Sequence, residues 1–244
     1  MVNEGNNPIK QNMTTKQRVK LGTASKFSVL AGTTITNTGN TSIYGTASGK
    51  VGLFPGSAFT GQESASVSER VQLADADALA AKNDLVMAYN DADERTSVTR
   101  IPSELDGTTL TPGVYDSADG AFKIMGTLTI DAKVDSDAVF IFKTASTLIT
   151  ASSSNVNLIN NARFCQTIWK VGSSATLGTD SHMVEHVLAL TSITANRGAT
   201  VLGQLLTRNG AVTLDTNTIA NGVSATTAIH LVSYFISNPS QINP

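Results

Sequence analysis

Hydrophobic and polar positions follow one three-part pattern within residues 139–217, and the pattern occurs four times. Each unit begins with a run that is apolar at successive positions, continues with an alternating run that carries Thr or Ser, and closes with a looser run. The period is roughly 18 to 28 residues, which is typical of stacked supersecondary units. Three strand-like runs per unit predict a mostly-β fold, a three-sided β-solenoid. The first runs are 139–142, 167–169, 187–190 and 205–206; the second are 146–149, 174–177, 192–195 and 211–214; the third are 155–158, 182–185, 199–202 and 217–220.

The rest of the chain fits the same pattern in part. Residues 27–44 repeat the three runs, so we predict a further coil there, and residues 114–130 give another pass. The Gly- and Pro-punctuated residues 49–61 indicate a loop or irregular coil. The apolar run 228–236 reads as a last strand that covers the end of the stack. We therefore expect a tail over 1–20, a single domain over 21–236 and a second tail over 237–244.

One segment changes its period from 2 to 3.6. Apolar residues recur at spacings of three and four from Val67 to Tyr89, which predicts one amphipathic helix over about 66–90. Ser64, Ser66 or Ser68 is the candidate N-cap.

This helix needs an apolar surface to cover. A strand with one solvated face alternates, whereas 139–142 and 187–190 are apolar at successive positions, so both of their faces are expected to be buried. We therefore predict that the helix lies along the side formed by the first run of each unit.

The second runs carry the most unusual chemistry. With period 2, their outward positions hold small hydroxyl and methyl groups and no formal charge. Stacked coils would place equivalent residues about 4.7 to 4.9 Å apart in a flat, stiff array. A β-branched Thr has few rotamers to lose on binding, so ordered water or a crystalline surface could dock on it. The outward positions are Thr34, Thr36, Thr127, Thr129, Thr147, Ile149, Ser174, Thr176, Ser192, Thr194, Ala211 and Thr213.

Composition narrows the function further. Of the 244 residues 15% are charged and the net charge is -2, which gives no electrostatic footprint for nucleic acid or anionic lipid. No apolar run reaches the 18 or more residues of a membrane span. Cys165 is the only cysteine, so no intrachain disulfide can form, and beside Phe164 and Trp169 we expect it to be buried.

Residues 182–186 spell H-x-x-E-H, a zinc-peptidase signature whose mechanism needs both histidines on one face of a helix. Here the motif falls inside the β repeat, where residues i and i+4 are about 13 Å apart and cannot share one metal ion. The outward positions also lack the paired carboxylates that glycoside hydrolysis requires. We expect no catalytic residue, metal or cofactor.

Seven stretches form an ordered set along the chain: 21–24, 27–32, 55–58, 110–115, 138–142, 171–179 and 208–215. Taken together, they resemble the signature segments of the microbial ice-binding protein family with the discontinuous β-solenoid fold. The resemblance implies a right-handed, triangular solenoid with a helix alongside and an N-terminal coil that stacks next to the C-terminal ones. It also implies an ice-binding surface on the side of the second runs, in a protein that is secreted or exposed at the cell surface. That surface would comprise Thr34, Thr36, Ser174, Thr176, Ser192, Thr194, Ala211 and Thr213, with Thr127, Thr129 and Thr147 further along.

The sequence therefore favours a non-enzymatic, monomeric ice-binding protein, whose partner is the ice crystal surface with its ordered water. Expected consequences are thermal hysteresis and inhibition of ice recrystallisation. The alternative is a surface-adhesion or glycan-binding β-solenoid that uses the same side or the third. Aromatic platforms favour sugars, and only Tyr44 is an obvious outward candidate, which counts against this alternative.

Overall fold

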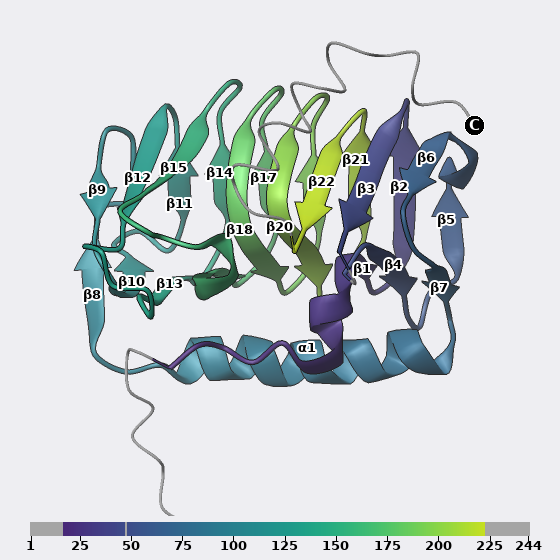
Figure 1. Cartoon of the computed structure of the whole chain (residues 1–244), viewed down its shortest axis with the longest axis horizontal. Coiled ribbons are helices and arrows are strands. Elements are labelled where there is room, and N and C mark those ends of the chain that lie inside the picture. The colour runs from purple at the N-terminus through teal and green to yellow at the C-terminus, as the bar shows by residue number, and fades with distance from the viewer. Residues whose placement is uncertain (1–16, 47, 223–244) are drawn as a thin grey trace, which may run out of the picture.

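The computed structural model describes residues 17–46 and 48–222. The strands stack into a three-sided β-solenoid with one helix alongside (Figure 1). Two parallel sheets form it: a 15-stranded sheet wraps around two sides, and a seven-stranded sheet makes the remaining one. The solenoid predicted from the repeating runs is confirmed.

The helix side of the solenoid faces the helix, and the second and third sides follow it in the order of the predicted runs. The helix side consists of β8 (Val98–Ile101), β10 (Gly113–Ser117), β13 (Phe140–Thr144), β16 (Thr167–Val171), the second halves of β18 (His182–Ala189) and β20 (Thr200–Thr207), β1 (Phe27–Ala31), β4 (Lys50–Leu53) and β7 (Val71–Leu73). The second side consists of β11 (Phe122–Ile124), β14 (Leu148–Thr150), β17 (Ala175–Leu177), β19 (Ile193–Ala195), β21 (Val212–Asp215), β2 (Thr34–Thr38) and β5 (Ala58–Thr60). The third side consists of β9 (Thr109–Leu110), β12 (Thr127–Asp131), β15 (Asn155–Ile159), the first halves of β18 and β20, β22 (Thr218–Asn221), β3 (Thr41–Gly45) and β6 (Ala65–Val67). Three short 3-10 helices, η1 (Gly22–Lys26), η2 (Gln62–Ser64) and η3 (Phe164–Gln166), lie at corners.

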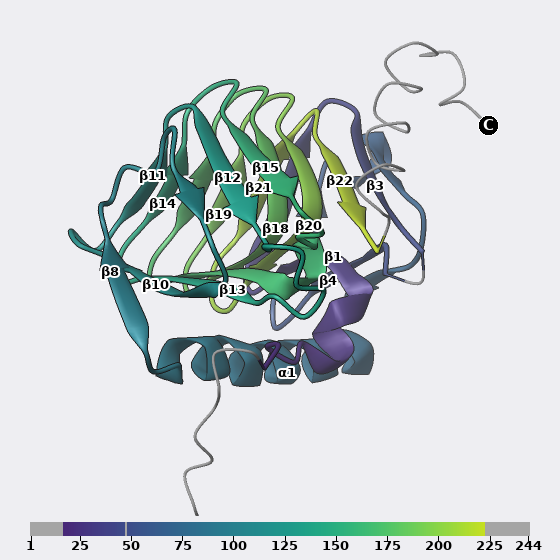
Figure 2. The same cartoon turned by 60° about the vertical axis from the view of Figure 1, so that its left-hand side comes forward.

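The order of coils in space differs from their order in the chain. The last described coil stacks on the first, since β20 pairs with β1, β21 with β2, and β22 with β3. A second N-terminal coil, β4 to β6, then extends the stack, and α1 carries the chain back to the opposite end (Figures 1 and 2). The discontinuous arrangement implied by the family resemblance is therefore confirmed.

The helix α1 spans Ala76–Glu94 and begins about ten residues later than predicted. Val67 and Val71, which gave the early helical spacing, belong to β6 and β7 and pair with the first coils. A spacing of four also fits two separate short strands, which explains the error. The N-cap is Asp75, whose carboxylate accepts a hydrogen bond from the Ala78 N–H at 2.8 Å.

The predicted docking of the helix is confirmed. The buried face of α1 includes Ala81, Leu85, Ala88 and Tyr89, and it packs on outward side chains of the helix side such as Ile141. Central strands of this side, such as β1 and β16, are consequently buried on both faces, as the unbroken apolar runs predicted. Tyr89 adds a hydrogen bond from its hydroxyl to the Val171 carbonyl at 3.0 Å.

The structure contradicts one further expectation and leaves others untested. Cys165 is exposed, because its neighbour Gln166 turns inward on η3 and leaves the thiol outside. Val19 packs against the hydrophobic cluster that includes Leu85 and Tyr89 of α1. The predicted domain boundary at residue 21 stays a prediction. The predicted strand 228–236 lies outside the described residues. Within residues 17–46 and 48–222, no helix is long and apolar enough to cross a membrane.

The H-x-x-E-H motif lies in β18, as predicted, and its two histidines meet different surroundings. His182 is exposed and its Nδ1 lies 2.6 Å from the Thr200 hydroxyl. His186 is buried against Phe164, and its Nδ1 has no hydrogen-bond partner among the described residues. Burial lowers the pKa of His186 to about 4.

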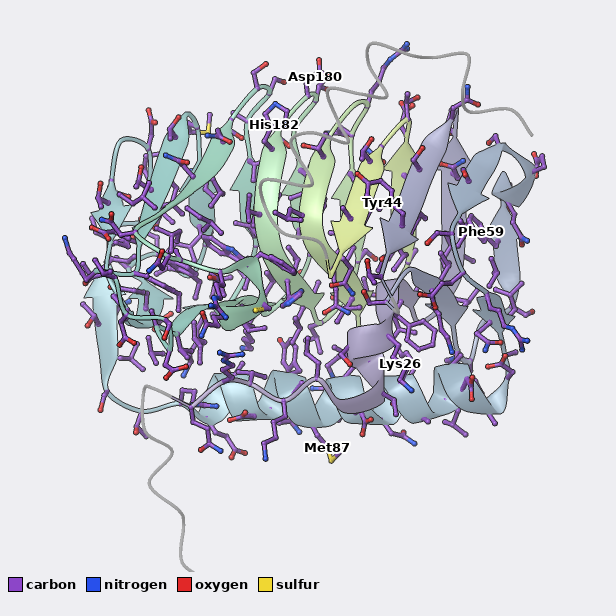
Figure 3. All side chains as sticks on the ribbon, in the orientation of Figure 1. Lys26, Tyr44, Phe59, Met87, Asp180 and His182 are labelled. Carbon is purple, nitrogen blue, oxygen red and sulfur yellow. The ribbon has the colours of Figure 1, made fainter. Side chains whose placement is uncertain are left out.

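The packing of α1 predicts that truncation of two of its side chains will change the free energy of unfolding by different amounts. Leu85→Ala removes a fully buried side chain and should lower the free energy of unfolding by about 2–5 kcal/mol. Met87 points away from the stack and is 62% exposed (Figure 3), so Met87→Ala should change it by less than about 0.5 kcal/mol. Denaturant unfolding followed by circular dichroism measures both. Equal losses would mean that the helix is not held by this face.

The burial of His186 predicts a pH dependence of stability. The folded protein disfavours the charged imidazole, whereas the unfolded chain titrates at its ordinary pKa of 6.5. The stability is therefore complete above pH 6.5 and should fall by on the order of 3 kcal/mol as the pH drops from 6.5 to 4. His186→Leu should remove this part of the pH dependence in denaturant titrations, and His182→Gln should retain it.

Candidate functional site

One row of side chains crosses the second side from end to end. Its members are register partners on neighbouring parallel strands, so their side chains point to the same face. Five consecutive members are threonine, and we call these five the threonine ladder. In spatial order the row is Glu104, Lys123, Ile149, Thr176, Thr194, Thr213, Thr36 and Thr60, of which the last five form the ladder.

A second row lies one pleat earlier, two residues before each member of the first row except Glu104. The distance between the rows along a strand is about 6.6 Å, and neighbouring strands are about 4.8 Å apart. Its members are small and uncharged, so the two rows form a rectangular array. They are Ala121, Thr147, Ser174, Ser192, Ala211, Thr34 and Ala58.

The hydroxyl groups of the two rows differ in what they bind. Ser174 and Ser192 turn back to the backbone, where they accept hydrogen bonds from the Ser192 and Ala211 N–H groups at 3.3 and 3.2 Å. Within the described part of the chain, no protein group hydrogen-bonds with a side-chain hydroxyl of the threonine ladder. These hydroxyls are consequently available to water, while the serines help to fix the coils.

The corner before the second side sets its register. A chain of backbone hydrogen bonds runs from coil to coil there, for example from the Gly32 N–H to the Gly210 carbonyl at 2.8 Å and from the Gly210 N–H to the Thr191 carbonyl at 2.9 Å. A Cβ at Gly32 or Gly210 would lie within 2.6 Å of a neighbouring backbone atom, so only glycine allows this close approach. Each following strand therefore begins at the same height.

The interior behind the two rows is tightly packed. The residue between each pair of outward positions points inward, and Ile35, Leu148, Ala175, Ile193 and Val212 are all at most 1% exposed. At the β11 end the inward residue is Phe122, which packs edge-on against Phe142 and Trp169. Because the core leaves no room for the strands to shift, the outer array is rigid.

Nine of the eleven residues predicted for the binding surface lie in these two rows. Thr127 and Thr129 do not: they belong to β12, which pairs with β9 and β15 on the third side. Their alternation with Leu128 and Ile130 is that of any strand with one buried face, so it does not identify the side. In that coil the second side is formed by β11, with Lys123 outward.

The structure adds Ala58 and Thr60, which the sequence reasoning missed. The Gly- and Pro-rich segment 49–61, for which a loop or irregular coil was expected, contains β4 and β5, so Ala58 and Thr60 extend both rows by one strand. The available signal was the sequence Ala58-Phe59-Thr60, which repeats the small–apolar–Thr pattern of the other second runs.

Charged groups lie at the margins of the array. Arg197 is exposed in the turn after β19, and Asp215 ends β21, where its carboxylate accepts a hydrogen bond from the Thr216 hydroxyl at 2.9 Å. Among the described residues, no three His, Cys, Asp or Glu side chains come together as a metal site would require.

Several known proteins are similar to this chain in sequence and fold. Residues 29–220 match the ice-binding-like family. The chain is 40% identical over 208 residues to the ice-binding protein of Nostoc sp. (strain HG1), which covers 82% of this chain and 73% of that one.

Two crystal structures of ice-binding proteins share the fold. One, from an Antarctic biological consortium, has a TM-score of 0.81 at 38% identity and covers 88% of this chain and 96% of that one. The other, from the Antarctic ascomycete Antarctomyces psychrotrophicus, has a TM-score of 0.79 at 35% identity and covers 85% of this chain and 100% of that one. The chain therefore belongs to the ice-binding-like family, a family of ice-binding proteins and not of enzymes.

Proposed function

We propose that this protein adsorbs to ice through the second side, with the threonine ladder at the centre of the contact. The observation that carries the proposal is the unbroken register of five threonines whose hydroxyls are open to water. The part of the second row that flanks the ladder, which is Ser174, Ser192, Ala211, Thr34 and Ala58, completes the contact surface.

The physical basis is an array that needs no rearrangement to bind. Thr is β-branched and stiff at χ1, so little side-chain entropy is lost when it meets an ordered surface. The strand spacing of about 4.8 Å repeats across the side, and methyl groups between the hydroxyls hold water in fixed positions. An ordered water layer on the array can then merge with a matching plane of ice.

Adsorption through many weak contacts explains how the protein would stop the growth of ice. Each hydroxyl contributes little alone, but all of them are presented by one rigid body, so binding is effectively multivalent. Ice that grows between adsorbed molecules becomes curved, and the curvature opposes further growth. The expected effects are thermal hysteresis and inhibition of recrystallisation.

The same reasoning bears on assembly and location. A single chain carries the whole array, so a monomer suffices for adsorption. Because ice forms first outside cells, we infer that the protein acts when it is secreted or held at the cell surface.

A glycan-binding role has weaker support. Sugars favour open aromatic platforms, and Tyr44 on the third side is instead half-buried against Leu202 and Ala220. The raised pKa of Tyr44, which follows from its burial, agrees with this position.

Bulky substitutions test the surface directly. Ala211→Tyr or Thr194→Tyr places a ring in the middle of the array, which would hold the rest of the surface away from ice. Thermal hysteresis should be abolished while the circular dichroism spectrum and denaturation midpoint stay unchanged. Unaltered hysteresis would remove the second side from the mechanism.

Thr127→Tyr is the matched control, since Thr127 is exposed and occupies an equivalent outward position on the third side. It should leave hysteresis unchanged. Adsorption of a fluorescently tagged wild-type protein to a single ice crystal tests the activity independently of any substitution.

A further inference from the structure

The row that contains the threonine ladder is chemically uneven. Five neighbouring strands, β17, β19, β21, β2 and β5, present Thr, whereas the next two positions are Ile149 and Lys123. Glu104 follows as an isolated bridge partner of Lys123. The charged end of the second side is thus the end next to β8 and β9, far from the N-terminal coils (Figure 2).

The backbone of Lys123 is fixed in this row. Its N–H donates to the Ser103 carbonyl at 2.8 Å, and its carbonyl accepts from the Leu105 N–H at 2.9 Å. The side chain is exposed, and within the described residues it takes part in no ion pair. The neighbouring Glu104 carboxylate is occupied by the backbone N–H groups of Asp106 and Met125, at 3.1 and 3.3 Å.

An ammonium group at this position opposes contact with ice. A charge retains its hydration shell, and its removal from liquid water is unfavourable unless a counter-charge or hydrogen-bonding partners replace that shell. The Lys side chain is also longer than that of Thr. Ile149, which is 38% exposed, lacks the hydroxyl and reaches one carbon further than Thr.

We infer that Lys123 and Ile149 end the ice-contacting part of the second side. The contact surface then comprises β17, β19, β21, β2 and β5, spans about 19 Å across the strands, and lies toward the coil formed by β4, β5 and β6. Thr60, on the outermost strand, is a contact residue at the opposite limit. This inference rests on the proposed function and assigns the boundaries of that surface.

The test is a gain of activity. The double substitution Lys123→Thr with Ile149→Thr lengthens the ladder from five positions to seven, and thermal hysteresis at equal protein concentration should rise by roughly two-fifths or more. Lys123→Thr alone should give part of the increase. Lys26→Thr is the control, because it removes the same charge from an exposed position on η1, away from the second side (Figure 3), and should change nothing.

A reciprocal substitution tests the opposite end of the threonine ladder, at Thr60. Thr60→Lys places a charge on the last strand of the ladder and should lower hysteresis, whereas Lys123→Arg should leave it unchanged. No gain from the double substitution in a folded protein, or no loss from Thr60→Lys, would overturn the inference. Failure of the wild-type protein to adsorb to ice would instead overturn the proposed function, so the two failures are distinguishable.

Discussion

The constraint on which the structure depends is the parallel backbone ladder that stacks the coils in register. At the corner before the second side, the ladder passes from Gly32 to Gly210 and on to Thr191, and glycine is required where backbones meet closely. The spacing of side chains on the outer surface is therefore the spacing of the strands, about 4.8 Å. Hydrogen bonds between the strands and the apolar core hold the coils together, while the threonines of the ladder point outward in register.

The helix and the discontinuous topology follow from the same stacking. The threonine ladder joins Thr213 to Thr36, which are neighbours in space and distant in the chain. Continuity of the array thus depends on the first coil docking on the last. The helix α1 runs along the stack from the N-terminal coils to the opposite end (Figure 1). Its buried Leu85 and Tyr89 belong to the hydrophobic cluster between the helix and the helix side. The helix side thus helps to fix the coil order on which the continuity of the array depends.

Much of this could be predicted from the sequence, and the failures have a common cause. The repeating runs predicted the solenoid, and the unbroken apolar stretches predicted where the helix docks. Thr127 and Thr129 were wrongly placed because alternation reports a buried face and not which of three sides carries it. Thr60 was missed because a Gly- and Pro-rich segment can still contribute a strand when it pairs with an ordered neighbour such as β2. Pairing partners, which decide both cases, are not contained in local periodicity.

The distribution of charge completes the division between the sides. Two lysines of the helix side lie at the C-terminal end of α1, where Lys170 pairs with Asp93 at 2.6 Å and the Lys143 ammonium donates to the Arg95 carbonyl at 3.1 Å. The partial negative charge of a helix C-terminus favours this arrangement. Charges placed there stabilise the helix contact, whereas a charge within the threonine ladder would carry a hydration shell that disrupts ordered water. A three-sided solenoid can carry charges at the helix contact and keep the threonine ladder uncharged, since each coil contributes a separate segment to every side.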